Sequence, residues 1–181
     1  ASQMNDKKRI AEFSGALGYS FNLQGDFKSA RCYYKEQMVL SKKEKMLKEW
    51  AASLGLIGNL DIDEGHLDIA MECFKKQKKY YTDYEMKMEL APVYSNMATV
   101  YLRKGKIADA SDYYNRQLKI CNKYDLKNER SKSLGNLAII NFIQGKFNDA
   151  LYIFQKVLDV NHEIGDQQAI AKSLGNIGQA H

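Results

Sequence analysis

Apolar residues recur at helical spacing along the chain, and the same arrangement returns every 40 residues after a glycine at positions 25, 65, 105 and 145. A bulky apolar residue, an alanine, an aromatic residue and a closing apolar residue follow each glycine. The four columns are Phe27, Leu67, Ile107 and Phe147; Ala30, Ala70, Ala110 and Ala150; Tyr34, Phe74, Tyr114 and Phe154; and Leu40, Tyr80, Ile120 and Val160. Successive columns keep the spacing of one helical stripe. Each glycine therefore precedes a helix of several turns that has one buried face.

The segment before each glycine has a helical stripe of its own. A glycine or alanine stands seven residues upstream and follows an apolar residue. The pairs are Leu17-Gly18, Ile57-Gly58, Met97-Ala98, Leu137-Ala138 and Ile177-Gly178. A small side chain lets this helix approach the alanine column closely, and the glycine between the helices supplies the left-handed turn conformation. The pattern predicts antiparallel helix hairpins at about 7–44, 45–84, 85–124 and 125–164, then the first helix of a fifth repeat at 165–181.

These columns resemble the tetratricopeptide repeat, and the resemblance covers nearly the whole chain. The period departs from the family, since 40 residues replace about 34, and the proline that usually closes the second helix is missing. Stretches such as SLGNLA (133–138) and SLGNIG (173–178) are similar to the Leu-Gly-Asn repeats of Pins-type proteins, and the long period is similar to kinesin light chains. HEAT and armadillo repeats lack this glycine-to-alanine spacing. The resemblance implies an all-α, right-handed superhelix, a single array over 1–181.

The fifth repeat contains a first helix without a second one. Its packing residues Leu174, Ile177 and Gly178 therefore have no second helix of the same repeat to cover them. Terminal repeats in such arrays normally carry a polar outer face. We therefore expect the sequence to be a piece of a longer array, or to self-associate through this uncapped C-terminal repeat.

Pro92, the single proline, falls early in the first helix of the third repeat. Proline lacks a backbone N–H and clashes with the preceding turn inside a helix. Two structures are compatible with it. The helix begins late, near Leu90, with Pro92 in its first turn, or it is kinked where the Met88 carbonyl has no partner.

The resemblance also implies a concave groove lined by the first helices. The family's groove positions are counted from the small glycine or alanine of the first helix. Three of them lie two residues before it, one residue after it and five residues after it. The fourth lies one helical turn before the position that is two residues before it. In this chain the columns are Ala16, Leu56, Asn96, Asn136 and Asn176; Tyr19, Asn59, Thr99, Ile139 and Gln179; Leu23, Asp63, Arg103 and Ile143; and Glu12, Ala52, Pro92, Lys132 and Lys172. The candidate peptide-binding residues are Asn59, Asn96, Thr99, Arg103, Lys132, Asn136, Ile139, Lys172 and Asn176.

Three asparagines in register give the sharpest functional signal. A primary amide donates and accepts, so it can bind both the N–H and the C=O of an extended peptide. Asparagine is also a mediocre helix former. The ladder of Asn96, Asn136 and Asn176 therefore suggests peptide capture, although bonds to a neighbouring helix or simple solvation are the alternatives. Lys132 and Lys172 resemble part of the carboxylate clamp of chaperone-binding tetratricopeptide domains, and the alternative for them is a solvated surface.

A further polar column lies in the second helices, where the family pattern usually carries alanine. It consists of Gln37, Gln77 and Gln117. These side chains either pack against the first helix of the next repeat or reach the groove, and packing is the favoured interpretation.

Net charge and hydropathy narrow the classes of partner. The chain has 27 Lys and Arg against 22 Asp and Glu, a formal charge of +5, which is a mild bias towards acidic partners. An RNA-binding solenoid needs a groove of one sign, whereas the groove positions mix Glu12, Asp63, Arg103 and Lys132. No apolar run reaches the about 20 residues of a membrane span. We therefore expect no nucleic-acid or membrane partner.

No constellation predicts catalysis or a cofactor. Three separated cysteines without a CxxC motif favour a reducing compartment, hence a cytoplasmic protein. None of the three histidines has a partner at the spacing of a nucleophile or metal site. The stretch LDIDEGH (60–66) is loosely like a calcium loop, but its glycine has the wrong offset and no later glutamate completes it. We expect no enzyme, no metal and no cofactor.

The functional hypothesis is a protein–protein interaction module that holds a partner peptide or helix in its groove. The alternative is a sensory or regulatory domain that binds a signalling peptide and controls an attached or associated output domain, as bacterial tetratricopeptide regulators do. RNA binding by an α-solenoid is the third and least favoured hypothesis.

Overall fold

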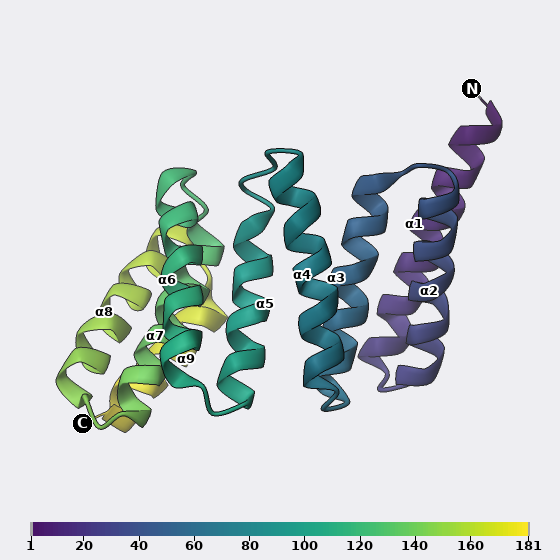
Figure 1. The fold of residues 1–181 in the computed structure, drawn as a ribbon. Coiled ribbons are helices and arrows are strands. Elements are labelled where there is room, and N and C mark those ends of the chain that lie inside the picture. The colour runs from purple at the N-terminus through teal and green to yellow at the C-terminus, as the bar shows by residue number, and fades with distance from the viewer. Residues whose placement is uncertain (1, 181) are drawn as a thin grey trace. The chain divides into compact units, whose positions relative to one another are not determined.

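The structure, a computed structural model, describes the backbone of residues 2–180 and the side chains of residues 6–178. The described chain is helical apart from its turns (Figure 1). The helices are α1 (Ser2–Leu23), α2 (Phe27–Lys43), α3 (Leu47–Asp63), α4 (Leu67–Asp83), α5 (Leu90–Arg103), α6 (Ile107–Lys123), α7 (Lys127–Ile143), α8 (Phe147–Ile164) and α9 (Gln167–Ala180). The predicted all-α architecture of helix hairpins is confirmed. None of the described helices combines the length and apolar character needed to cross a bilayer.

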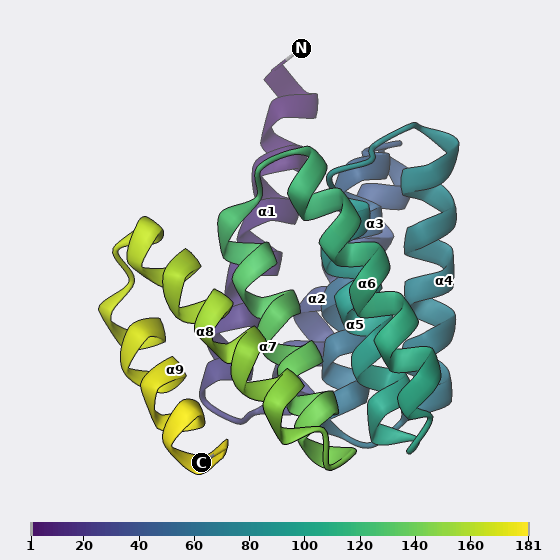
Figure 2. The same ribbon diagram turned by 90° about the vertical axis from the view of Figure 1, so that its left-hand side faces the viewer.

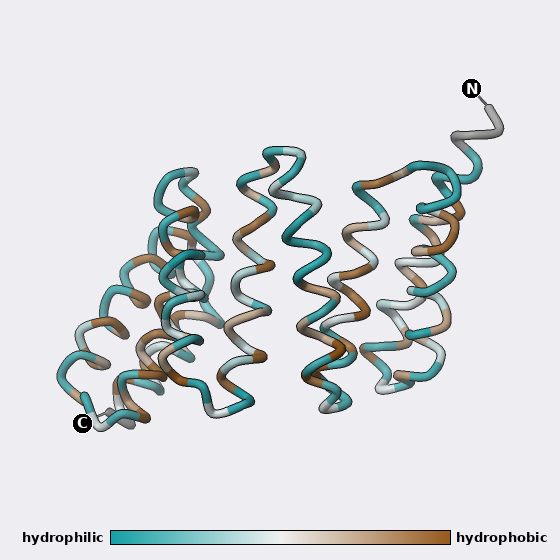
Figure 3. The backbone as a smooth tube through the Cα atoms, in the orientation of Figure 1, coloured by the Kyte–Doolittle hydropathy of each residue, from teal (hydrophilic) through white to brown (hydrophobic). Residues whose placement is uncertain are grey.

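The chain divides into two compact halves. The N-terminal half (Ala1–Glu85) contains α1 to α4, and the C-terminal half (Met86–His181) contains α5 to α9. Within each half, consecutive helices pack side by side. Figure 3 shows that apolar and hydrophilic stretches alternate along the helices, as the stripe pattern requires. The extent of a single array over the whole sequence stays a prediction.

Each hairpin closes around its alanine column. Ala30, Ala70, Ala110 and Ala150 are all 0% exposed, and the aromatic column beside them is buried as predicted. A Cβ added to Gly58 would lie 2.7 Å from the Phe74 ring, so the glycine makes room for the aromatic residue of the same hairpin. In later repeats an alanine, Ala98 or Ala138, takes that position and is fully buried. The small column thus fixes how closely the two helices approach.

The hairpin core continues into the next repeat within each half. In the C-terminal half, one cluster joins Ala98 of α5, Tyr114 of α6 and Ile140 of α7. The N-terminal half has an equivalent cluster in which Tyr34 of α2 meets Ile57 of α3. A hairpin therefore buries one face internally and another against its neighbour, which is how repeat arrays gain stability. Phe147 departs from its column, because its ring remains exposed.

Every turn contains one residue in the left-handed region, at a spacing of 20 residues. Within the hairpins these residues are the predicted glycines; between hairpins they are Lys45 (φ 59°), Glu85 (φ 52°), Asp125 (φ 50°) and Gly165 (φ 77°). At the end of α2, the Met46 N–H donates to the Ser41 carbonyl at 2.8 Å and the Lys45 N–H donates to Lys42. These bonds form a Schellman cap. Sequence reasoning identified the glycine turns and missed the turns that lack glycine.

The interpretation of Pro92 as a first-turn residue is confirmed. Helix α5 begins at Leu90, so Pro92 is its third residue. Helices α3 and α7 begin at Leu47 and Lys127, three residues earlier in repeat register than α5. The missing N–H of proline has no intrahelical acceptor in the first turn anyway, and the Met88 carbonyl accepts from the Ala91 N–H at 3.1 Å.

The glutamine column packs within its own hairpin. The Gln37 amide lies over Gly15, and the Gln77 amide lies over Gly55, so close that a Cβ on either glycine would be 2.6 Å from the amide nitrogen. Gln117 is buried as well. The favoured interpretation, packing, is therefore correct, and Gln37 and Gln77 contact the first helix of their own repeat.

The two helical glycines Gly58 and Gly135 should respond oppositely to alanine. We expect Gly58→Ala to destabilise the protein by about 1–3 kcal/mol, because the new Cβ meets the buried Phe74 ring. Gly135→Ala should stabilise it by about 0.5–1 kcal/mol, because nothing lies within 4 Å and alanine is the better helix former. Urea denaturation of both variants measures the difference. Equal effects would contradict the close contact described for Gly58.

The turns without glycine should gain stability when glycine is introduced. Left-handed backbone costs a residue with a Cβ roughly 1–2 kcal/mol, and less for aspartate, which visits this region more readily. We therefore expect Lys45→Gly to raise the free energy of unfolding by about 1 kcal/mol and Asp125→Gly to raise it by less. Thermal and urea unfolding of the two variants test the order. A loss of stability in Lys45→Gly would exclude the left-handed turn.

Candidate functional site

A pocket of about 310 Å³ lies in the C-terminal half, where side chains of α5, α7, α8 and α9 converge. Helix α8 packs against both α7 and α9, and Figure 2 shows the three together. The lining residues are Ser95, Ser131, Lys132, Gly135, Asn136, Ile139, Val157, Asn161, Ala169, Lys172, Ser173 and Asn176. First helices therefore form the walls, and α8 contributes the floor.

Five of the nine predicted groove residues meet in this pocket. They are Lys132, Asn136, Ile139, Lys172 and Asn176. The amides of Asn136 and Asn176 come from equivalent positions on α7 and α9 and are partly exposed. In the described part of the chain, neither amide is engaged in a hydrogen bond. The 40-residue period thus places two unengaged amides and two lysines on one concave surface.

The remaining four candidates do not line the pocket. On α5, Asn96 is partly buried and Arg103 is exposed at the helix end. The Thr99 hydroxyl bonds to the Ser95 carbonyl at 3.1 Å and to the Tyr114 hydroxyl at 3.2 Å, so it already has partners inside the protein. Asn59 is exposed on α3 in the N-terminal half. The side chain of Gln179 lies outside the described residues.

The pocket is positively charged at one end. Its lining contains Lys132 and Lys172 and no aspartate or glutamate. Both lysines are exposed, and neither forms an ion pair within the described part of the chain. Two acidic residues, Glu129 and Asp166, line an adjoining pocket that Lys132 also lines, so the excess of positive charge is confined to this pocket.

A buried hydrogen-bonded network forms the polar floor. The Ser131 hydroxyl donates to Asn161 Oδ1 at 2.5 Å, and Asn161 Nδ2 donates to the Ser173 hydroxyl at 3.0 Å. Ser173 in turn donates to the Ala169 carbonyl. Asn161 thereby ties α7 to α9 across the end of α8. Sequence reasoning missed Asn161. The available signal was a polar side chain on the buried face of a helix.

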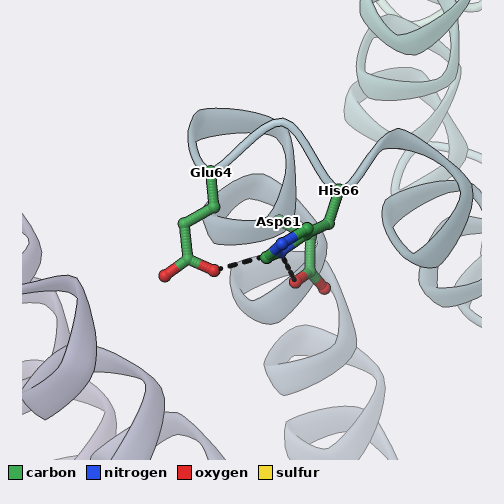
Figure 4. A group of neighbouring side chains, drawn as sticks. All are labelled: Asp61, Glu64 and His66. Atoms are coloured by element: carbon green, nitrogen blue, oxygen red, sulfur yellow. Dashed lines mark ion pairs between the residues drawn. The ribbon is translucent and has the colours of Figure 1, made fainter.

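A second polar cluster lies in the N-terminal half, within the stretch LDIDEGH (60–66) that the sequence analysis compared with a calcium loop. Asp61, Glu64 and His66 gather their side chains where α3 turns into α4, as Figure 4 shows. His66 Nδ1 lies 3.3 Å from Glu64 Oε2 and 3.8 Å from Asp61 Oδ1. These residue types can ligate a metal ion. Asp61 is 1% exposed, so its charge needs compensation.

Arg31 supplies that compensation. Its Nη2 lies 2.6 Å from Asp61 Oδ1 and 2.5 Å from Glu64 Oε2, between the two carboxylates. Burial alone lowers the pKa of Arg31, but its hydrogen bonds to Asp61 and Glu64 outweigh that effect and the pKa is raised. The guanidinium thus takes the place of a bound cation. We interpret the cluster as an ion-pair contact between α2 and α3.

The cysteines do not form a reactive centre. Cys32 is exposed, Cys73 is half-buried, and Cys121 is fully buried. Burial raises the pKa of the Cys121 thiol to about 11, so this thiol stays protonated at neutral pH. Burial and the neighbouring Asp61 charge also raise the pKa of Cys73. Neither group is therefore an activated nucleophile.

Comparison with known proteins places the repeat in a family. Residues 89–163 match the family model described as tetratricopeptide repeat. Residues 89–163 therefore form a tetratricopeptide-type repeat segment. No curated protein sequence matches it significantly.

Solved tetratricopeptide structures share this fold. BtubC from P. vanneervenii is 16% identical with a TM-score of 0.78, and the match covers 99% of this chain and 82% of that one. A putative kinesin light chain from Podospora anserina with nearly identical tetratricopeptide-like repeats is 14% identical with a TM-score of 0.76. The match covers 96% of this chain and 86% of that one. A signal transduction ATPase from Pyrococcus horikoshii with a tetratricopeptide repeat sensor is 15% identical with a TM-score of 0.80. The match covers 94% of this chain and 26% of that one. The predicted all-α tetratricopeptide class is confirmed, and such folds generally mediate protein–protein interaction.

Removing one partner of the Arg31–Asp61 ion pair should destabilise the protein more than removing both partners. Arg31→Met leaves the Asp61 carboxylate buried without its partner, and we expect a loss of about 3 kcal/mol in the free energy of unfolding. The double variant Arg31→Met/Asp61→Leu should recover most of that loss, because no buried charge remains. Urea denaturation of the single and the double variant measures the two free energies of unfolding. A single variant within about 0.5 kcal/mol of the wild type would show that the pair does not constrain the helices.

Proposed function

We propose that this protein binds a partner protein through an extended segment laid in the pocket walled by α7 and α9. The observation that carries the proposal is the pair of unengaged amides, Asn136 and Asn176, on one concave surface. Each amide can donate to a backbone C=O and accept from a backbone N–H. Main-chain bonds would give affinity for an extended chain, and the neighbouring side chains would give specificity.

The contrast with the other polar groups supports a binding role. Asn161 is buried and bonded to Ser131 and Ser173, which is what a structural asparagine does. Asn136 and Asn176 are partly exposed and make no such bonds. Alanine would be the more stable choice at both positions if they only had to form a helix. Their chemistry is therefore available to a ligand.

A sensory or regulatory role is the second candidate. It is favoured by the structural similarity to the Pyrococcus horikoshii signal transduction ATPase, which carries a tetratricopeptide repeat sensor. Under this proposal the same pocket binds a signalling peptide and controls an attached or associated output domain. It requires that peptide binding change the activity of that partner domain, whereas the first proposal requires binding alone.

Replacing Asn136 by alanine separates binding from folding. We expect Asn136→Ala to weaken an extended peptide selected on the wild-type protein by about 5- to 150-fold, because about 1–3 kcal/mol is lost when its backbone groups are left unpaired. Stability should change by less than about 0.5 kcal/mol, since no internal bond is removed. Isothermal titration and thermal melting measure the two effects.

Asn148→Ala is the matched control. Asn148 is an exposed asparagine on α8 that does not line this pocket, so its replacement should leave both properties unchanged. If Asn136→Ala lowers the melting temperature by several degrees and binding is unaffected, the amide is structural and the proposal fails.

A further inference from the structure

The turn between α3 and α4 carries a set of side chains that the equivalent turns lack. It brings together Asp61, Glu64 and His66. At the 40-residue spacing, the position of Asp61 holds Phe21, Tyr101 and Asn141, the position of Glu64 holds Gln24, Lys104 and Gln144, and the position of His66 holds Asp26, Lys106 and Lys146. Among the four complete repeats, the second alone therefore combines two carboxylates and an imidazole at these positions.

The fold does not need a carboxylate at position 61. In the first and third repeats an aromatic ring stands there and stacks on a ring of the second helix. The ring centroids of Phe21 and Tyr33 lie 5.4 Å apart, and those of Tyr101 and Tyr113 lie 5.3 Å apart. Asp61 is instead a carboxylate that is 1% exposed. Burying a charge is costly, and packed apolar residues are often as stable as a buried ion pair. Packing alone therefore does not account for Asp61.

The ion pair with Arg31 satisfies only part of this carboxylate. Arg31 Nη2 contacts Oδ1 of Asp61 at 2.6 Å. The other oxygen, Oδ2, is buried and has no hydrogen-bond partner in the described part of the chain. An ionised carboxylate can accept through both of its oxygens, and a metal ion can bind both of them. The buried oxygen therefore points to a cation as a further partner of Asp61.

The three ligand atoms already lie close to the geometry of a metal site. His66 Nδ1 is 3.3 Å from Glu64 Oε2 and 3.8 Å from Asp61 Oδ1 (Figure 4). All three ligand atoms lie within 4.8 Å of one another. Zn²⁺ binds nitrogen and oxygen at about 2.0–2.2 Å, so neighbouring ligand atoms of a tetrahedral site are roughly 3.3–3.6 Å apart. Glu64 and His66 are exposed, so rotation of their side chains can close the remaining distances.

The backbone of the turn holds the three residues together. The His66 N–H donates to the Asp61 carbonyl at 2.7 Å, and the Glu64 N–H donates to the Leu60 carbonyl at 3.0 Å. Gly65 between them has a left-handed φ of 82°. Because the turn is fixed by these bonds, only side-chain rotation remains to be restricted when an ion binds, which lowers the ordering cost.

Arg31 and a metal ion would compete for the same oxygens. Its Nη2 lies between the carboxylates of Asp61 and Glu64, at 2.6 and 2.5 Å. Two cations placed between these oxygens would repel each other. The Arg31 side chain is 23% exposed and belongs to the preceding repeat, on α2. The guanidinium can therefore turn into solvent without any change in the turn that carries the ligands.

We infer that Asp61, Glu64 and His66 form a binding site for a divalent metal ion of the Zn²⁺ class, which replaces the Arg31 guanidinium. One imidazole with two carboxylates suits Zn²⁺, whereas Ca²⁺ and Mg²⁺ prefer oxygen ligands alone. The stretch does not fit a calcium loop because that loop needs oxygen ligands at fixed offsets. The ion pair is the metal-free arrangement. Metal binding exchanges a link between α2 and α3 for a link within the turn.

Titration of the untagged protein with ZnCl₂ after treatment with a chelator tests the inference. Isothermal titration should show saturable binding of one Zn²⁺ per chain. We expect Arg31→Met to bind Zn²⁺ at least about 10-fold more tightly than the wild type, because the competing guanidinium is gone. Saturating Zn²⁺ should also raise the melting temperature of this variant by at least about 3 °C, since the ion binds only the folded state. Ca²⁺ and Mg²⁺ should do neither.

A matched pair of histidine variants locates the site. In the Arg31→Met background, His66→Ala should weaken Zn²⁺ binding at least about 10-fold, because one of three ligands is lost. His162→Ala removes an exposed histidine that lies outside the cluster and should change binding by less than about twofold. Circular dichroism of each variant confirms that it is folded.

Four outcomes would overturn the inference. They are the absence of saturable Zn²⁺ binding to Arg31→Met, equal affinities of this variant and the wild type, equal losses in His66→Ala and His162→Ala, and a loss in Cys73→Ser that His66→Ala does not share. The last two would assign the ion to scattered surface groups or to a thiol. None of them bears on the peptide pocket, which lies in the other half of the chain.

Discussion

The close contact between the two helices of each hairpin is the constraint on which the rest of the structure depends. The alanine column is 0% exposed in all four complete repeats, and a glycine or alanine stands across from it. Because the second helix fills one face of the first, the opposite face of each first helix is left for neighbours and solvent. The same contact that closes a hairpin therefore determines which residues of α5, α7 and α9 can form a groove.

In the proposed binding mode, stability and binding use different polar groups of the C-terminal half. Ser131, Asn161 and Ser173 are bonded to one another beneath the pocket and link the helices that wall it. Asn136 and Asn176 stand above that network without internal partners. A bonded floor holds the walls in place, so the exposed amides and lysines keep a fixed arrangement. Preorganisation of this kind lowers the ordering cost of binding.

The sequence predicted the repeat, the hairpins and the glycine turns, because each depends on local spacing or on a single residue type. For Pro92 it left two alternatives, and the late start of α5 is the one that the structure shows. It also predicted five residues that share one pocket. It did not predict the left-handed conformation of Lys45, since nothing in that residue type requires it. It missed Arg31 with Asp61, whose contact joins residues 30 positions apart. Such contacts follow from hairpin packing, which composition and periodicity do not specify.

The measurement closest to the central claim is a ¹⁵N-resolved NMR titration of the side-chain amides with a selected extended peptide. If the peptide backbone lies along the groove, the NH₂ resonances of Asn136 and Asn176 shift on binding and exchange with water more slowly, whereas those of Asn148 do not change. Shifts confined to Asn148 and its neighbours on α8, with the Asn136 and Asn176 amides unchanged, would contradict a binding surface formed by α7 and α9.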